Sequence, residues 1–215
     1  MYGAIIGDLA GSIYEYSQLK SISNINADKI ITEASFYSDD TILTIAILDA
    51  ILNKGNYEEY LKKYIKKYAN YKPDFTPYFK TPFSKGLIDW SNSSIVGTST
   101  GNGAMMRISP VGYLFNTEES VIKNVQLATI PSHNSKEAVA AATIVALMIF
   151  YFRNGLSRDE VYQRLNIKIE YHPFKKFNTT CHETIGNCLY ALYNSKSFED
   201  AIRKTISMGG DTDTN

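Results

Sequence analysis

Residues 138–152, AVAAATIVALMIFYF, form an almost wholly apolar stretch that decides the expected fold. A helix that is apolar around its whole circumference is buried either in a protein core or in a membrane. About 15 residues fall short of the roughly 20 that a helix needs to cross a bilayer. We therefore expect this stretch to form a buried central helix, with the rest of the chain packed around it.

The segments on either side also have helical patterning. Residues 41–52, TILTIAILDAIL, are apolar around most of a helix and end close to Gly55, a natural C-terminal stop. In residues 57–71, leucine, isoleucine and tyrosine recur every three or four positions, while lysines occupy the other face. Such patterns predict helices at residues 41–52, 57–71, 118–130, 135–152, 157–165, 182–193 and 198–207.

Two segments depart from this patterning. Pro73, Pro77 and Pro82 make residues 72–84 an irregular connection, because proline removes a backbone donor and restricts its neighbour. Residues 166–171 are the only stretch with β-like character, and they are short. The predicted fold class is therefore all-α.

The composition limits the classes of function. A chain of 215 residues fits one domain with a full hydrophobic core, or two small domains. Apolar residues make up 44% of the chain, which excludes a disordered protein. Lys+Arg and Asp+Glu are both 22, so the charge balance gives no reason to expect nucleic acid or an anionic membrane as the main partner.

The cysteines and the N-terminus suggest a compartment. On one helix, Cys181 and Cys188 would be separated by a rise of roughly 10 Å, which is beyond disulfide reach. The first residues, MYGA, lack the basic region that opens a signal peptide. A reducing, cytoplasmic location is the expectation.

Two short acidic clusters lie far apart in the sequence. The first is Ser38-Asp39-Asp40-Thr41, and the second is GGDTDTN at residues 209–215. Four carboxylates are stable together only when a positive group offsets their desolvation and repulsion. Oxygen ligands without cysteine or histidine favour magnesium, manganese or calcium. If the fold joins the clusters, a binuclear metal site results.

Each cluster also has a simpler interpretation. Ser38 or Asp39 could be an ordinary N-cap, since acidic residues suit the start of a helix. The second cluster could be a glycine C-cap followed by a polar turn. The spacing of Asp211, Asp213 and Asn215 matches the start of an EF-hand loop, but the glycine and glutamate that complete such a loop are missing.

Glycines recur every four residues in the N-terminal segment GAIIGDLAGSIYE, residues 3–15. In a helix this spacing permits close approach of a neighbouring backbone. Asp8 and Glu15, seven positions apart, would share one helix face. The alternative is tight helix packing with both acids in solvent.

A second polar, glycine-rich segment, GTSTGNGAMMR, spans residues 97–107 and runs into a helix. Such loops expose backbone amides that bind phosphate. Arg107 could meet a phosphate or form a buried ion pair. His133 opens the long apolar helix, as a ligand-binding residue, a cap or a core histidine. The remaining histidines and the cysteines are too few for a closed zinc site.

Five motifs in order resemble the ADP-ribosylglycohydrolase family. They are GAIIGDLAGSIYE, SDDT, GNGAMMRISPVG, SHNSKEA and GGDTDTN, and they extend over nearly the whole chain. The resemblance implies a compact, single-domain, orthogonal all-α bundle with two Mg²⁺ or Mn²⁺ ions in a central binuclear site. It also implies that residues 1–215 form one domain lacking the helix or helices that follow GGDTDTN in other members.

Roles follow from the resemblance position by position. The implied metal ligands are Ser38, Asp39, Asp40, Asp211, Asp213, Thr214 and Glu15. The implied catalytic acids are Asp39, Asp40 and Glu15. The implied ADP-ribose contacts are Thr98, Ser99, Thr100, Gly101, Asn102, Gly103 and His133. Ser38 departs from the threonine of many relatives, but its hydroxyl can still bind a metal ion.

The implied activity is metal-dependent release of ADP-ribose from modified side chains, with the N-glycosidic bond to arginine favoured. The partner would be an ADP-ribosylated protein or a small ADP-ribose conjugate. Two alternatives remain open: a member that binds ADP-ribose with slow turnover, and a structural member that uses only the helical shell. The acceptor residue and the oligomeric state are not encoded in a recognisable motif.

Overall fold

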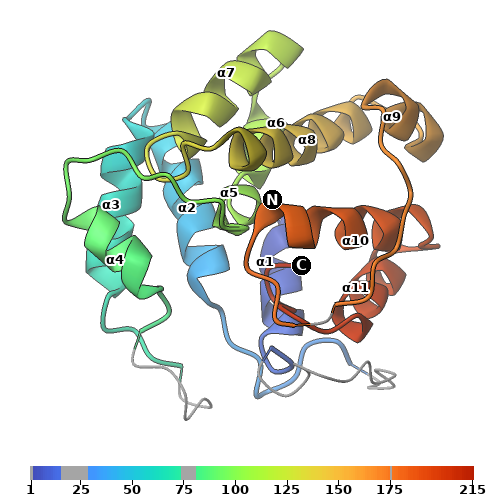
Figure 1. The fold of residues 1–215 in the computed structure, drawn as a ribbon, viewed down its shortest axis with the longest axis horizontal. Helices are drawn as coiled ribbons and strands as arrows, with labels where there is room; N and C mark the ends of the chain where they lie inside the picture. The colour runs from blue at the N-terminus through green and yellow to red at the C-terminus, as the bar shows by residue number, and fades with distance from the viewer. Residues whose placement is uncertain (1, 16–28, 74–80, 175) are drawn as a thin grey trace.

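The computed structural model describes residues 2–15, 29–73, 81–174 and 176–215 (Figure 1). Within these ranges the chain forms eleven helices and no strand, which confirms the all-α prediction. The helices are α1 (Tyr2–Gly11), α2 (Asp39–Leu52), α3 (Tyr57–Tyr68), α4 (Lys85–Ser91), α5 (Gly103–Met106), α6 (Ser109–Leu114), α7 (Glu118–Thr129), α8 (Lys136–Arg153), α9 (Arg158–Arg164), α10 (Cys181–Tyr193) and α11 (Phe198–Ser207).

The apolar stretch 138–152 forms most of α8, which lies at the centre of the helix contacts. Ser135 caps this helix, with Oγ accepting a hydrogen bond of 3.1 Å from the amide of Ala138. α8 packs against α5, α6, α7, α9 and α10. Ala138, Ala142 and Ala146 are fully buried on it, so its small residues let the neighbouring helices approach closely. The prediction of a buried central helix is confirmed.

Two groups of helices flank the middle of the fold. α2 packs against α3 and α1, and α10 packs against α11 and α8. Figure 1 shows α2, α3 and α4 on one side and α1, α10 and α11 on the other, with α5 between them. The start of α2 and the end of the chain therefore face the same central region from opposite sides.

The N-terminal helix is shorter than the sequence suggests. α1 ends at Gly11, and residues 12–15 form turns. Asp8 and Glu15 therefore do not share one helix face, and both are buried rather than in solvent. The helix ends because the C-terminal backbone crosses it at Gly11, where a Cβ atom would lie only 2.0 Å from the carbonyl oxygen of Thr212.

Other differences are local. Residues 166–171 are not a strand, because Asn166 has a positive φ of 51° and turns the chain after α9. The short helices α4 and α6 were not predicted, and α3 stops three residues earlier than expected, at Tyr68. Of the prolines expected to break residues 72–84, Pro77 lies outside the described residues.

Both cysteines lie on α10 and are free thiols, as predicted. None of the helices in the described residues combines the length and the apolar character that crossing a membrane requires.

Candidate active site

The first acidic cluster starts α2. Ser38 is the N-cap, and its Oγ accepts a hydrogen bond of 3.1 Å from the amide of Asp40. Asp8, fully buried on α1, accepts hydrogen bonds from the amides of Ser38 at 2.9 Å and Thr41 at 3.0 Å. Because Ser38 and Asp8 satisfy the helix start, neither Asp39 nor Asp40 is needed as a cap.

Asp40 connects this cluster to the end of the chain. Its Oδ2 accepts one hydrogen bond from Ser38 Oγ at 3.1 Å and another from Thr214 Oγ1 at 3.2 Å. These two hydroxyl groups come from the two clusters, which are separated by more than 170 positions in the sequence. The fold therefore brings the predicted clusters together.

Long-range contacts hold the second cluster in place. Gly210 has a φ of 78°, and a Cβ atom there would lie 2.1 Å from Asn178 Oδ1. The same Oδ1 accepts a hydrogen bond of 2.9 Å from the amide of Asp211. On the other side of the loop, Thr212 Oγ1 donates to the carbonyl of Gly11 at 2.9 Å. This loop is thus fixed between α1 and the segment that precedes α10.

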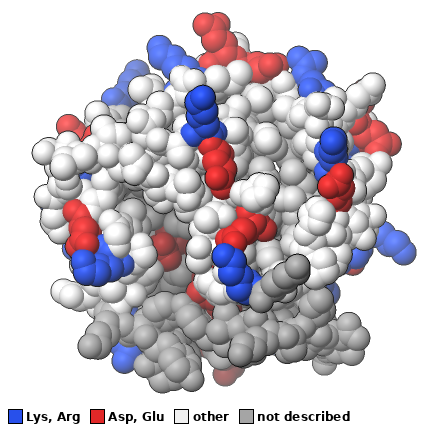
Figure 2. All heavy atoms as spheres, in the orientation of Figure 1, with Lys and Arg blue, Asp and Glu red and all other residues white. Residues whose placement is uncertain are grey.

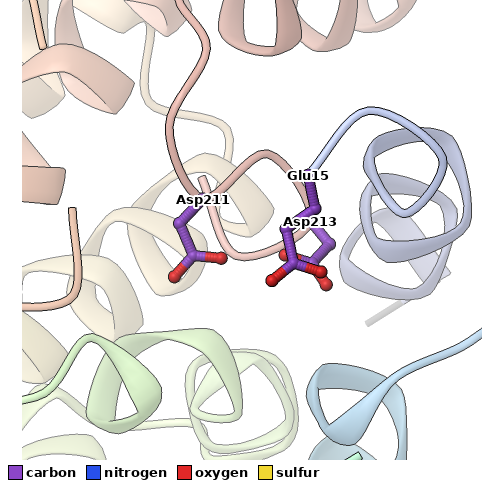
Figure 3. A group of neighbouring side chains, drawn as sticks. All are labelled: Glu15, Asp211 and Asp213. Atoms are coloured by element: carbon purple, nitrogen blue, oxygen red, sulfur yellow. The ribbon is translucent and has the colours of Figure 1, made fainter. Parts of the chain in front are cut away.

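Three carboxylates converge beside this loop (Figure 3). Glu15, from the turns after α1, meets Asp211 and Asp213, and one oxygen from each lies within 4.8 Å of the others. Figure 3 shows all three side chains pointing into the same space. The predicted ligand Glu15 therefore joins the second cluster.

The carboxylates raise one another's pKa values. Burial, followed by the charge of Asp213, raises the pKa of Asp39 to about 8 and that of Asp8 to about 7. The same two causes raise the pKa of Asp40 and of Asp211 well above the usual range. Without a compensating cation, several of these acids hold protons near neutral pH.

A cavity of about 620 Å³ opens over the joined clusters. Figure 2 shows a hollow on this face with acidic atoms inside, and a surface around it on which both signs of charge are mixed. Of the predicted site residues, the cavity is lined by Glu15, Ser38, Asp39, Asp40, Thr98, Ser99, Gly101, Asn102, Gly103, His133, Asp211, Asp213 and Thr214. The side chains of Phe36, Phe83, Leu87 and Trp90 add an apolar wall to the cavity.

Thr100 is the predicted site residue that does not line this cavity. It is exposed, and its carbonyl accepts a hydrogen bond of 2.9 Å from the amide of Cys181. The backbone bridge between Gly101 and Thr180 keeps Thr100 turned toward the start of α10. Its role in this structure is to anchor the loop.

The glycine-rich loop lies between α10 and the residues before α8. Thr98 forms a backbone bridge with His133, and the amide of Asn134 donates to the carbonyl of Gly97 at 2.8 Å. At the loop's other end, Asn102 Nδ2 donates to Asp211 Oδ2 at 2.6 Å. The loop that is expected to bind phosphate therefore contacts the acidic site directly.

Arg107 and His133 form a buried polar unit at the cavity wall. Arg107 is 1% exposed, and its Nη2 donates to Ser132 Oγ at 2.5 Å. Burial lowers the Arg107 pKa to about 10, and the charge of Asp39 acts in the opposite direction. Burial and then the charge of Arg107 lower the pKa of His133 to about 3, so its imidazole is neutral.

Comparison with known proteins agrees with this geometry. The family model described as ADP-ribosylglycohydrolase matches residues 1–215, the whole of the chain. The chain belongs to this family. The ADP-ribosylglycohydrolase motifs found in the sequence thus form one cavity in the structure.

Individual relatives are distant. A protein of Acanthamoeba polyphaga mimivirus, named as an ADP-ribosyl glycohydrolase, is 26% identical, and the match covers 99% of this chain and 81% of that protein. The ADP-ribosylhydrolase ARH3 of Homo sapiens is 25% identical over 74% of this chain and 50% of its own length, so the match spans about half of ARH3. A solved structure, described as an ADP-ribosylglycohydrolase-related protein complex, has a TM-score of 0.75 at 16% identity, covering 99% of this chain and 80% of that one. That likeness shows the fold.

The acidic site of this family member fits a hard divalent cation. Its donors are carboxylate and hydroxyl oxygens, and three carboxylates lie within 4.8 Å of one another. The raised pKa values of Asp39 and Asp211 mean that a positive charge would offset both the burial and the repulsion of these carboxylates. The residues present can therefore hold a metal ion.

Three residues with clear roles were not assigned by sequence reasoning. Asp8 anchors the start of α2, Asn178 holds the amide of Asp211, and Ser132 links Arg107 to His133. Asp8 and Ser132 lie inside motifs that the sequence analysis recognised, so the family pattern was a signal for them. Asn178 lies in none of the recognised motifs, and no local pattern marks it.

Proposed function

We propose that this protein is a divalent-cation-dependent hydrolase that releases ADP-ribose from ADP-ribosylated side chains, with the bond to arginine favoured. The observation that carries the proposal is the hydrogen bond from Thr214 to Asp40, because it joins the two acidic clusters. They meet on the wall of the cavity that the glycine-rich loop also lines. Residues 1–215 act in this proposal as one domain.

The cavity offers complementary surfaces for the parts of ADP-ribose. The glycine-rich loop would contact the diphosphate and the adjoining ribose through Thr98, Ser99, Gly101, Asn102 and Gly103. The apolar wall at Phe36, Phe83 and Leu87 suits an adenine ring. The acidic site would then face the distal ribose, whose C1″ carries the acceptor.

Two Mg²⁺ or Mn²⁺ ions would be held by the oxygen donors of the joined clusters. These donors are Glu15, Ser38, Asp39, Asp40, Asp211, Asp213 and Thr214. When bound, such ions would orient the ribose hydroxyl groups and make a water molecule more acidic.

The chain itself would move the protons. A water oxygen would bond to C1″, the bond from C1″ to the acceptor nitrogen would break, and the carboxylate that takes the proton of the water would pass it to the leaving guanidine. Asp39 or Asp40 would accept the proton that the water loses. Asp39 is the better candidate, because Asp40 already accepts hydrogen bonds from the hydroxyl groups of Ser38 and Thr214. These bonds occupy the lone pairs of Asp40 Oδ2 that would otherwise accept the proton.

A binding protein with little turnover is the second candidate. The match spans only half the length of ARH3, so the activity of that whole relative does not transfer automatically. Tight binding of ADP-ribose, with no release from modified proteins, would favour this alternative.

The test is release of free ADP-ribose from an arginine-mono-ADP-ribosylated protein, in Mg²⁺ and in excess chelator. A serine-linked substrate in parallel separates a wrong acceptor from a missing activity. We expect release in Mg²⁺ that the chelator abolishes. The hydrolase proposal is contradicted if neither substrate is cleaved although ADP-ribose binds.

A further inference from the structure

The hydrogen bonds around His133 determine which of its ring nitrogens carries the proton. Arg107 Nη2 lies 2.5 Å from Ser132 Oγ and 3.4 Å from His133 Nδ1. Ser132 Oγ lies 2.8 Å from the same Nδ1. A guanidinium can only donate, so Ser132 Oγ accepts from Arg107 and has its own hydrogen left to donate. The acceptor of that hydrogen is His133 Nδ1.

The other tautomer would place donors against donors. With a proton on Nδ1, the ring would point an N–H at the Arg107 guanidinium, and the hydroxyl hydrogen of Ser132 would have no hydrogen-bond acceptor among the described residues. Ser132 and His133 are 4% and 6% exposed, so water cannot freely replace a lost partner. The neutral imidazole therefore carries its hydrogen on Nε2.

The Nε2 side of the ring faces the glycine-rich loop. A Cβ atom added to Gly101 would lie 3.5 Å from Nε2, and one added to Gly103 would lie 3.6 Å from it. Among the described residues, no hydrogen-bond partner of Nε2 is present, whereas Nδ1 is fully engaged. Both glycines and His133 line the cavity. Glycine at both positions leaves this donor uncovered.

We propose that Arg107 and Ser132 are positioning residues that fix His133 in its Nε2–H form. His133 then donates a hydrogen bond from Nε2 into the cavity, beside Gly101 and Gly103, to an oxygen atom of the diphosphate or ribose of ADP-ribose. It does not exchange protons during the reaction, which leaves acid–base chemistry to the carboxylates. The ligand named here rests on the proposed function, whereas the tautomer does not.

The charged groups around this unit agree with a neutral ring. Arg107 is the charged side chain that contacts His133, and a second positive charge beside it would be repelled. The negative charge of Asp39 raises the pKa of the Arg107 guanidinium. Asp39 is not among the causes that shift the pKa of His133. Within the described ranges, His133 therefore has no acidic partner that would favour its protonated form.

The first experiment is ¹⁵N NMR of the histidine rings in the full chain without ligand. Comparing the spectra of the wild type and of His133→Ala identifies the ring signals of His133, because the other two histidines are present in both. We expect His133 to show a protonated Nε2 and an unprotonated Nδ1 from about pH 5 to pH 8. A proton on Nδ1, or titration of the ring within this range, would overturn the proposal.

The second experiment compares Ser132→Ala with Ser132→Thr, which keeps the hydroxyl group. We expect Ser132→Ala to let the ring populate both tautomers and to raise the Kd for ADP-ribose about fivefold, the loss of one hydrogen bond. Ser132→Thr should retain the wild-type spectrum and affinity. Identical behaviour of the two variants would show that the hydroxyl group has no positioning role.

These readouts separate the two proposals. If the wild type failed to bind ADP-ribose but showed the Nε2–H form, the proposed function would fail and the tautomer assignment would stand. If ADP-ribose were released from a modified protein while His133 carried its proton on Nδ1, the proposed function would stand and the tautomer assignment would fail. Should Ser132→Ala not fold, the wild-type spectrum and Ser132→Thr still decide the assignment.

Discussion

The two acidic clusters meet in one site but are held in different ways. The first is fixed at the start of a helix, since Ser38 caps α2 and Asp8 of α1 accepts two further amides at the same turn. The second lies in a loop that depends on distant partners, namely Gly11, Asn102 and Asn178. The first cluster thus combines a local cap with one contact to α1, whereas the second has no helix of its own and is held by three distant segments.

Substitution of Gly11 should have the largest effect, because it should displace the second cluster and leave the first in place. In Gly11→Ala the new Cβ atom would overlap the carbonyl of Thr212 at 2.0 Å and push the second cluster away from α1. We expect the free energy of unfolding to fall by about 3 kcal/mol, the Tm to fall by about 6–12 °C, and ADP-ribose release to be abolished.

The matched control for this variant is Gly186→Ala. Gly186 lies in α10, and no atom would lie within 4 Å of a Cβ atom there. Thermal unfolding and release assays on both variants check the prediction. Full activity of Gly11→Ala would mean that the second cluster does not need its contact with α1.

Removing a charge from the first cluster should raise the stability of the chelated protein and lower its activity. Asp39→Asn takes away one of the repelling carboxylates, so the variant should unfold at a higher temperature than the wild type when both are chelated. In Mg²⁺ it should release ADP-ribose about 100- to 1,000-fold more slowly, the scale of a lost general base. The control is Asp89→Asn, whose carboxylate is exposed on α4.

The chelated protein should lose stability as the pH rises. The pKa of Asp39 is raised from 3.8 to about 8 by folding, so the folded state binds more protons between these values. The free energy of unfolding then falls from about pH 4 to about pH 8, with a loss in Tm on the order of 10 °C or more. Excess Mg²⁺ should suppress this fall, because a bound cation replaces the protons.

Thermal melts across this range, with and without Mg²⁺, provide the measurement. A Tm that stays constant or rises with pH in the chelated protein would mean that the carboxylates are not held close together. The experiment thus tests whether burial, together with repulsion between the clusters, raises the pKa values of these carboxylates.

The smallest effect is expected away from both clusters. His133→Ala removes the proposed donor to ADP-ribose, so the Kd for ADP-ribose should rise about tenfold, while Mg²⁺ affinity stays unchanged. His182→Ala, at an exposed position of α10, is the control. Equal loss of Mg²⁺ binding in His133→Ala would show that this wall and the acidic site are not independent.

Much of the fold could be predicted from local patterns. The apolar run 138–152 became α8, and the periodic segment at residues 198–207 became α11 with the predicted bounds. The short helix α4 gives too little periodicity to be recognised, whereas the equally short α9 begins with a capping box, Ser157 to Glu160, and was predicted at residues 157–165. Every site residue that the sequence motifs predicted, except Thr100, lines the cavity.

The contacts that assemble the site could not be predicted. The burial of Asp8 follows from its contact with α2, 30 positions away, and the end of α1 follows from the C-terminal backbone crossing Gly11. Asn178 holds Asp211 across 33 positions, without any local pattern to mark it. Thr100 belongs to the predicted loop, but only the bridge to α10 shows that it is turned away from the cavity.

The most direct test of the central claim is calorimetric titration of Mn²⁺ into the wild type, Asp39→Asn, Asp211→Asn and the double variant. If the clusters form one site, each single substitution weakens binding strongly, and the double variant loses little more than the worse single variant. A joined site would be contradicted if the losses in Mn²⁺ binding free energy of the two single variants added up in the double variant, or if Asp39→Asn bound Mn²⁺ as tightly as the wild type.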